Sequence, residues 1–282
     1  MNHRISLPLL NIPENIDQLP VCIISLKEAN SRRNLLHKRG FSEELLSNYF
    51  PATDLRFSGH TLVQCYVDRD TSTQRYGREL RPAEVGCALS HMNAYKWLVS
   101  SPHHLMLILE DDVIPLSDNH LEEVKLICQA LTPLIKNNVS FVCHLGIQES
   151  YFQSGYSRPV KFSPEQGHIP GLVLHNDKGR SVWLAHAYLI SSPAAAKIIQ
   201  FGKVKYLADD FLAFQKCGAI QRILISKAAI YKQDHALEST VQLKYKNKTT
   251  QRIKILRKFN AIYSRFVSYV TKNLPFLIKT TH

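Results

Sequence analysis

Short apolar runs alternate with polar, helix-forming stretches along most of the first 230 residues. The runs expected to form buried strands are 21–26 (VCIISL), 49–55 (YFPATDL), 104–109 (HLMLIL), 140–145 (SFVCHL), 182–190 (VWLAHAYLI) and 220–231. The stretches expected to form helices are 27–48, 82–99, 120–133, 193–201 and the one that begins at Asp209-Asp210. Residues 56–80 and 146–181 are expected to be irregular connections. This alternation predicts an α/β fold built on one central sheet.

The charge of the chain is concentrated at its C-terminal end. The formal net charge is +12 over 282 residues, and the ten basic residues from Lys244 onward are accompanied by no Asp or Glu. We therefore divide the chain into a nearly neutral catalytic body, residues 1–243, and a basic tail, residues 244–282. Apolar residues recur in the tail at helical spacing, at Ile255, Leu256, Phe259, Ile262, Tyr263, Phe266 and Val270. This pattern predicts a basic amphipathic helix that lies on an anionic membrane, or else packs on the body.

The cysteines and the apolar segments bear on the cellular compartment. The six cysteines have no CxxC or Cys/His ligand spacing, so we expect reduced thiols. No apolar window approaches the roughly 18–20 residues of a transmembrane helix, and no secretory signal is readable. The expected location is cytoplasmic.

Three consecutive carboxylates, Glu110-Asp111-Asp112, directly follow the most apolar strand. Adjacent like charges are unfavourable unless a cation lies nearby, and Mg²⁺ or Mn²⁺ prefers oxygen ligands. The carboxyl end of a strand is also where open α/β sheets bind ligands. The alternative is a solvated turn in which Asp111 or Asp112 caps the next helix.

Several motifs around this triplet resemble those of glycosyltransferase family 25, the lipopolysaccharide and lipooligosaccharide biosynthesis group. The resemblance runs from about residue 20 to 240. It rests on VCIISL with Arg32-Arg33, FPATDL, RPAEVGCALSHMNAYKWLV, LMLILEDDVIPL, AHAYLISSPAAAKII and ADDFL. It implies a single GT-A-like α/β domain with a mixed central sheet, a UDP-sugar donor that is typically UDP-galactose, and inversion at the anomeric carbon.

The resemblance also implies roles for the acidic residues. The EDD triplet resembles the DxD motif that holds a metal and the donor diphosphate, which makes Asp112 the expected direct ligand, supported by Glu110 or Asp111. An inverting enzyme needs a carboxylate that takes the proton of the acceptor hydroxyl. The resemblance places this acid at Asp209 or Asp210, and we slightly favour Asp210. The alternative for this pair is a helix N-cap at Asp209.

Other candidate residues are less specific. Asp54 ends the second strand, where an acid often binds ribose, but it is equally typical of a turn. Arg32 and Arg33 are candidates for contacts with the diphosphate or uracil, or else lie on a helix surface. Glu84 and His91 are seven residues apart on one helical face, which can orient Asp112 or the acceptor. The alternative for His91 is a structural role in the core.

These inferences predict a metal-dependent hexosyltransferase that uses Mn²⁺ or Mg²⁺. Its partners would be a UDP-hexose, a lipid-linked oligosaccharide and, through the tail, the inner face of the bacterial cytoplasmic membrane. Two other classes of protein fit the sequence less well. A nucleic-acid-binding protein is disfavoured by the nearly neutral body. A metal-dependent phosphohydrolase would need a His-rich or two-metal ligand set, and no HxH or HD pattern occurs.

Overall fold

The computed structural model describes residues 7–10, 18–146, 157–161, 168–175, 183 and 185–237. The predicted basic tail, residues 244–282, lies outside the described residues. No helix within the described ranges is both long enough and apolar enough to cross a membrane.

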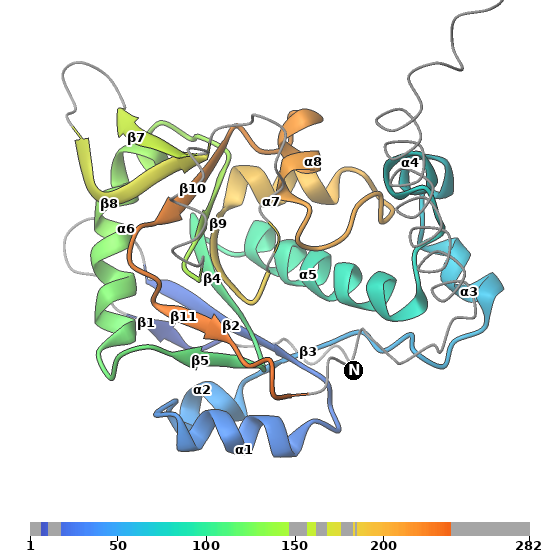
Figure 1. Cartoon of the computed structure of the whole chain (residues 1–282), viewed down its shortest axis with the longest axis horizontal. Helices are drawn as coiled ribbons and strands as arrows, with labels where there is room; N and C mark the ends of the chain where they lie inside the picture. The colour runs from blue at the N-terminus through green and yellow to red at the C-terminus, as the bar shows by residue number, and fades with distance from the viewer. Residues whose placement is uncertain are drawn as a thin grey trace, which may run out of the picture. The chain divides into compact units, whose positions relative to one another are not determined.

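A nine-stranded sheet forms the centre of the described structure (Figure 1). Its order is β1-β2-β4-β9-β6-β10-β8-β7, and β3 also pairs with β2. The strands are β1 (Leu9–Leu10), β2 (Leu19–Ser25), β3 (Phe50–Pro51), β4 (Leu105–Glu110), β6 (Phe141–His144), β7 (Ser157–Lys161), β8 (His168–His175), β9 (Ala187–Ser191) and β10 (Arg222–Ser226). A separate ribbon pairs β5 (Val113–Pro115) with β11 (Tyr231–Gln233).

The sheet is mixed, as predicted. Strands β2, β3 and β4 are parallel, and so are β6 and β10, whereas β9 runs antiparallel between β4 and β6. The carboxyl ends of β2, β3 and β4 therefore meet at one edge of the sheet, where the chain enters β9. The GT-A subtype stays a prediction.

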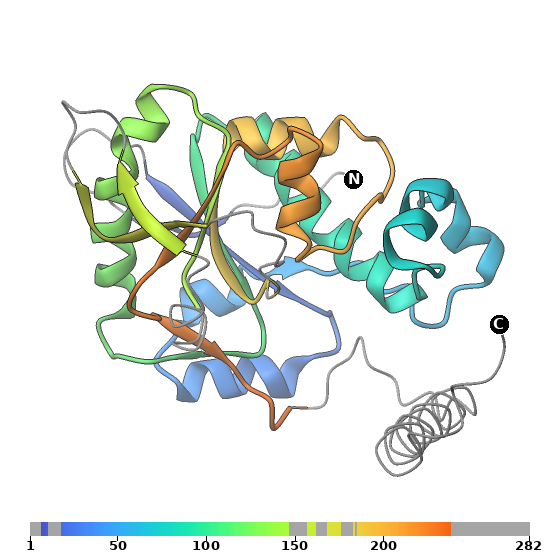
Figure 2. The same cartoon turned by 45° about the horizontal axis from the view of Figure 1, so that its top comes forward.

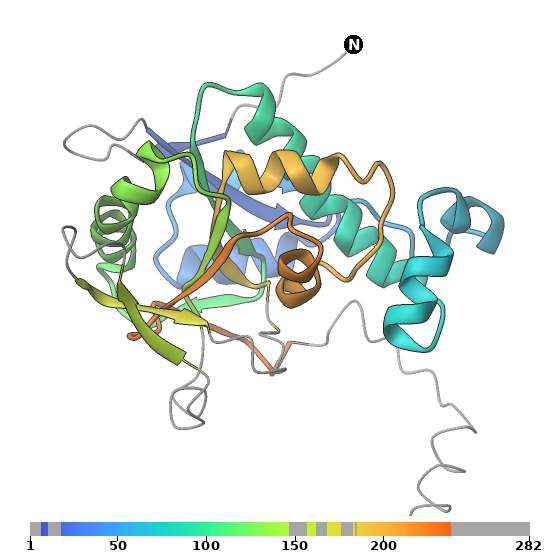
Figure 3. The same ribbon diagram turned by 90° about the horizontal axis from the view of Figure 1, so that it is seen from above.

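The helices are α1 (Asn30–Lys38), α2 (Glu43–Ser47), α3 (His60–Cys65), α4 (Arg69–Tyr76), α5 (Pro82–Ser100), α6 (His120–Lys136), α7 (Ser192–Ile199) and α8 (Phe211–Lys216). Successive strand residues point to opposite faces, so each face of the sheet has its own core. On one face the core includes residues of α5, α7 and α8, and on the other it includes residues of α1, α2 and α6 (Figure 3). Burial on both faces explains the nearly continuous apolar runs of the central strands.

The structure corrects two predicted connections. Residues 56–80 were expected to be irregular but contain α3 and α4, which lie beside the N-terminal end of α5 (Figure 2). The many polar residues of this segment gave no apolar helical pattern. The ends of α4 do carry helix signals: Asp68 accepts from the Thr71 N–H as N-cap, and Gly77 ends the helix at φ +66°. Residues 146–181 include β7 and β8, which extend the sheet: β8 pairs antiparallel with β10, and β7 pairs antiparallel with β8.

Two helix ends also differ from expectation. The predicted helix over 27–48 is divided into α1 and α2 at Gly40, which has φ +91°. Helix α6 continues past Pro133 instead of ending there. Proline cannot donate the hydrogen bond that the Gln129 carbonyl would receive in a regular helix, and the Thr132 hydroxyl donates to this carbonyl instead, at 2.7 Å.

Candidate active site

The three carboxylates lie at the edge of the sheet where β2, β3 and β4 end. Glu110 is the last residue of β4 and is in register with Ile24 of β2. Its backbone N–H donates to the carbonyl of His186, the residue just before β9. The triplet is thus placed by main-chain pairing on both sides, and each of its side chains has different hydrogen-bond partners.

Asp111 is held from the side of β2 and α1. The Ser25 hydroxyl donates to its Oδ2 at 2.7 Å, and Arg32 Nη1 donates to Oδ1. Burial raises the pKa of Asp111, and the charge of Arg32 and the hydrogen bond of Ser25 counteract this effect. Both carboxylate oxygens of Asp111 therefore have partners within the protein, and its charge is compensated.

Asp112 is held from the opposite side, by the ribbon of β5 and β11. Gln233 Nε2 donates to Oδ2 at 3.0 Å, and the Asp112 carbonyl accepts from the N–H of Asp234 at 2.8 Å. The other carboxylate oxygen, Oδ1, is buried and has no hydrogen-bond partner among the described residues. Burial and the charge of Glu110 raise the pKa of Asp112 to about 7. An unsatisfied, buried carboxylate oxygen is unfavourable without a positive ligand.

Glu110 faces α5, where it contacts His91. Glu110 Oε1 lies 3.3 Å from His91 Nε2, and the other ring nitrogen, Nδ1, lies 2.7 Å from the hydroxyl of Tyr188. That hydroxyl is 2.6 Å from the Tyr95 hydroxyl, which completes a buried chain of polar groups. Burial disfavours the charged form of Glu110, but the hydrogen bond and charge of His91 outweigh it, and the pKa of Glu110 is lowered.

The motif on α5 explains why His91 reaches Glu110. Gly86 packs directly on the segment after β3, because a Cβ there would lie 2.6 Å from the Thr53 carbonyl oxygen. Ser90, one turn later, accepts from the Thr53 N–H at 2.8 Å and donates to the Gly86 carbonyl at 2.7 Å. These contacts fix α5 against β3 and aim the face that carries Cys87 and His91 toward the end of β4.

Glu84 has a structural position at the start of α5. It accepts two hydrogen bonds from Arg78, each at 2.7 Å, and one from the Arg81 backbone N–H at 2.8 Å. Glu84 is thus the N3 residue of the capping arrangement of α5. It is not directed at Asp112, and the structure brings only His91 of this predicted pair to the triplet.

Arg33 and Asp54 also have partners within the protein. Arg33 is buried and donates to Ser25 Oγ and to the carbonyls of Leu26 and Lys27, and so shapes the turn after β2. Asp54 is exposed and forms an ion pair with Arg56 at 2.7 Å. The hydrogen bond from the Arg56 side chain lowers the pKa of Asp54. Of the two arginines, Arg32 is the one that reaches the triplet.

The two neighbouring aspartates before α8 have different surroundings. Asp210 is fully buried and accepts from Arg75 Nε and Nη2, at 2.8 and 2.9 Å, and from the Tyr76 hydroxyl at 2.9 Å. Asp210 is also the N-cap of α8. The alternative interpretation had placed this cap at Asp209. Asp209 is half-buried, and its charge acts on Cys87 together with those of Glu110 and Asp112. Asp209 is therefore the member of the pair whose charge reaches Cys87, beside Glu110.

Several residues of the site were not singled out in the sequence. Cys87, Tyr188 and His186 lie within the quoted motifs, and Cys87 and His91 share a helical spacing of four. Gln233 lies in a separate strand, far along the chain from Asp112. No local sequence signal points to it, because the contact depends on the pairing of β5 with β11.

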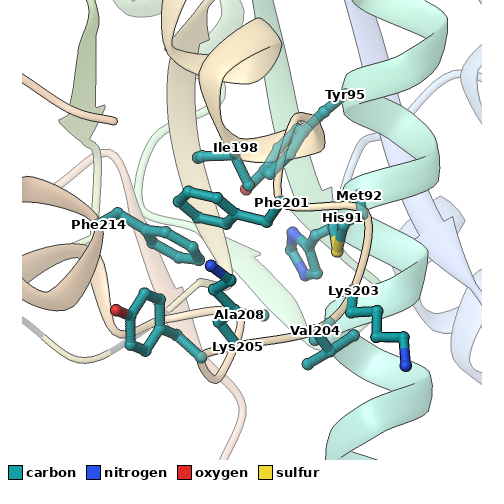
Figure 4. A pocket seen from close by; sticks show the side chains of 12 residues that line it. His91, Met92, Tyr95, Ile198, Phe201, Lys203, Val204, Lys205, Ala208 and Phe214 are labelled. Atoms are coloured by element: carbon teal, nitrogen blue, oxygen red, sulfur yellow. The ribbon is translucent and has the colours of Figure 1, made fainter. Parts of the chain in front are cut away.

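A pocket adjoins this site on the side of α5. It lies between α5, the end of α7 and the connection to α8, and apolar and aromatic side chains line most of it (Figure 4). Lys203 and Lys205 are among the lining residues, and the His91 ring projects into the pocket from α5. His91 therefore connects the pocket with Glu110.

Two comparisons with known proteins bear on this arrangement. None of the curated proteins matches the chain. The family model of glycosyltransferase family 25, described as an LPS biosynthesis protein, matches residues 18–213. This match covers more than half of the chain and includes the triplet, the α5 motif and both aspartates before α8. The chain therefore belongs to glycosyltransferase family 25, the family of glycosyltransferases of lipopolysaccharide biosynthesis.

Proposed function

We propose that this glycosyltransferase transfers a hexose from a UDP-sugar to a growing lipooligosaccharide or lipopolysaccharide chain, with inversion at the anomeric carbon. Galactose is the proposed sugar, by resemblance to the family. The observation that carries the proposal is that the three carboxylates differ in how far their oxygens are already bonded within the protein. Asp111 is neutralised within the protein, whereas Glu110 and Asp112 keep ligand capacity at the carboxyl end of the sheet.

The described residues fit a divalent cation at Asp112 and Glu110. Asp112 Oδ1, which has no partner within the described ranges, and the partly exposed carboxylate of Glu110 offer the hard oxygen atoms that Mn²⁺ and Mg²⁺ prefer. When bound, the cation would supply Lewis-acid stabilisation of the leaving diphosphate. Asp111 contributes indirectly, since its contacts with Ser25 and Arg32 fix the turn that carries the other two carboxylates.

The chain's own residues would perform the remaining steps. Arg32 is held beside the triplet by its ion pair with Asp111, and its guanidinium group would donate hydrogen bonds to the diphosphate. Asp209 would take the proton of the acceptor hydroxyl as that oxygen attacks the anomeric carbon, on the face opposite the bond to UDP. The new glycosidic bond forms while the bond to the diphosphate breaks, and UDP departs. The sequence slightly favoured Asp210 as the base. Both of its carboxylate oxygens, however, accept hydrogen bonds from Arg75, Tyr76 and the N-terminus of α8, so we assign the role to Asp209.

A donor screen tests the proposal. The purified full-length protein is supplied with Mn²⁺, a truncated lipooligosaccharide acceptor and, in turn, UDP-Gal, UDP-Glc or UDP-GlcNAc. Release of UDP that depends on both the acceptor and UDP-Gal is the expected result, with a product of the inverted anomeric configuration by NMR. Phosphate release from simple esters, without transfer from any UDP-sugar, would favour a phosphohydrolase instead.

The basic tail would bring the enzyme to its acceptor. Ten basic residues over 244–282, without an acidic one, suit an anionic membrane surface, and each adds about 1 kcal/mol of attraction near such lipids. We propose that the tail places the catalytic body at the inner face of the cytoplasmic membrane. Deletion of residues 244–282 should release the protein from the membrane fraction, and unchanged fractionation would contradict this role.

A further inference from the structure

Three side chains of different chemistry converge beside the carboxylate triplet. Cys87 and His91 occupy consecutive turns of α5, and Glu110 ends β4. One ligand atom from each, Sγ, a ring nitrogen and a carboxylate oxygen, lies within 4.8 Å of the others. His91 Nε2 and Glu110 Oε1 are 3.3 Å apart. The catalytic proposal above uses Glu110 but leaves the thiol of Cys87 without a role.

We propose that Cys87, His91 and Glu110 form a binding site for Zn²⁺, with a fourth position open to water. Zinc accepts thiolate, imidazole and carboxylate ligands in tetrahedral sites. Its usual bond lengths place neighbouring ligand atoms roughly 3.3 to 3.6 Å apart. The His91–Glu110 pair already has this separation, and Cys87 needs a shift on the order of 1 Å, which a change of side-chain torsion provides.

The contacts around His91 support metal binding. A ligating histidine usually donates its other ring N–H to an oxygen, which fixes the ring and leaves a lone pair on the ligating nitrogen. Tyr188 supplies this oxygen at 2.7 Å from Nδ1, and the two rings are stacked. The Tyr188 hydroxyl can in turn donate to Tyr95, so His91 can present the Nε2 lone pair to the metal. His91 also lines the pocket in Figure 4.

The ligand chemistry separates this site from the one at Asp112. A thiolate and an imidazole favour zinc over Mn²⁺ or Mg²⁺, which prefer oxygen ligands. Binding displaces the thiol proton of Cys87 and the proton on His91 Nε2 that faces Glu110, and both are released to solvent. Because Glu110 belongs to both sets, zinc would withdraw it from the cation at Asp112. Zinc would therefore inhibit transfer, a consequence that rests on the proposed function, whereas zinc binding itself does not.

Cobalt spectroscopy tests the site without any enzymatic assay. The full-length protein, stripped of metal by a chelator, is titrated with Co²⁺, whose bond to a thiolate gives a charge-transfer band in the near ultraviolet. We expect one equivalent of Co²⁺ to produce the band and Zn²⁺ to abolish it, because zinc binds such ligands more tightly. The Cys87→Ser variant should lack the band and bind Zn²⁺ at least tenfold more weakly. The matched Cys65→Ser variant, which alters an exposed cysteine of α3, should behave as wild type.

A second measurement uses only the wild-type protein and therefore does not depend on the folding of a variant. Zn²⁺ should slow alkylation of Cys87 by iodoacetamide at least tenfold while leaving alkylation of Cys65 unchanged, as mapped by mass spectrometry. Absence of the cobalt band in the wild type, its persistence in Cys87→Ser, or equal alkylation with and without Zn²⁺ would each overturn the zinc site.

The inhibitory consequence is measured separately in the presence of Mn²⁺. The Zn²⁺ concentration that halves each variant's own transfer rate should rise about tenfold in Cys87→Ser and stay at the wild-type value in Cys65→Ser. A cobalt band without any transfer from UDP-sugars would contradict the proposed function and leave the zinc site standing. Transfer without a cobalt band would overturn the zinc site and leave the proposed function standing.

Discussion

The side-chain amide of Gln233 donates to Asp112 Oδ2 at 3.0 Å, across 121 residues of sequence. This contact uses one oxygen of Asp112 and leaves Oδ1 buried and without a partner among the described residues. The strand that carries Gln233 therefore orients the carboxylate that the sequence singled out as the direct metal ligand. Asp112 is positioned by the tertiary structure and not by its two acidic neighbours.

Replacement of Asp112 by Asn should separate its charge from its position. Asn keeps an oxygen that can accept from Gln233 but loses the negative charge that a cation needs. We expect transfer to fall by roughly 100-fold in Mn²⁺, which corresponds to the loss of about 2.7 kcal/mol of transition-state stabilisation. The measurement is the rate of UDP release, together with the melting temperature to show that the fold is kept. Asp118→Asn, which alters an exposed carboxylate of the following loop, is the matched control, and equal rates in the two variants would refute the metal role.

Asp209 and Asp210 should respond differently to the same substitution. Asp209→Asn is expected to lower the transfer rate by 10²- to 10⁴-fold, as loss of a general base does, while the protein remains folded. Asp210→Asn should instead lower the free energy of unfolding by about 3 kcal/mol, because it breaks a buried pair with Arg75. Transfer rates and chemical denaturation of both variants decide between the roles. A fully stable Asp210→Asn variant that has lost transfer would restore Asp210 as the base.

The close approach at Gly86 gives a prediction about packing. A Cβ at this position would meet the Thr53 carbonyl oxygen at 2.6 Å, and backbone cannot move aside as a flexible side chain can. Gly86→Ala should therefore lower the free energy of unfolding by about 1 to 3 kcal/mol, as overpacking does. Gly59→Ala, where a Cβ meets nothing within 4 Å, is the control for the change in backbone entropy. Urea denaturation checks both, and equal stability would show that α5 and β3 are less closely packed than described.

The ion pairs of Glu84 with Arg78 and Arg81, at the start of α5, predict a pH dependence of stability. Burial disfavours the charge of Glu84, but the hydrogen bonds from Arg78 and Arg81 outweigh it, and the pKa of Glu84 is lowered. Its contribution is therefore present above the ordinary pKa near 4.5 and lost as the pH falls through the lowered value.

Glu84→Gln should reduce the free energy of unfolding at pH 7 by about 1 to 3 kcal/mol, and the difference from wild type should shrink toward pH 3. Denaturation curves over this range provide the measurement. Glu122→Gln on α6, where the carboxylate is exposed and pairs only with Lys125 among the described residues, is the control. A difference that grows toward acidic pH would contradict the assignment.

The sequence predicted the parts of the fold that follow from local patterns. The apolar runs of β2, β4 and β6 and the helix that opens at Pro82 were placed within a residue or two, because burial on both faces and helix capping leave clear signals. Helices α3 and α4 were missed because their surfaces are largely polar. Strand β7 was missed because a short edge strand has little apolar pattern, and β8 because Pro170 and Gly171 interrupt its apolar run.

What the sequence by itself determined is the chemistry: three acids after a buried strand, within motifs that place the chain in its family. Only the tertiary structure decided which of those groups remain available. Asp111, Asp210 and Glu84 form ion pairs with Arg32, Arg75 and Arg78, whereas one oxygen of Asp112 has no partner in the part of the chain that the structure describes. The physical reason is that a carboxylate's role depends on the charges and donors around it. Strand pairing and helix packing bring several of these from distant parts of the chain, and no local pattern records them.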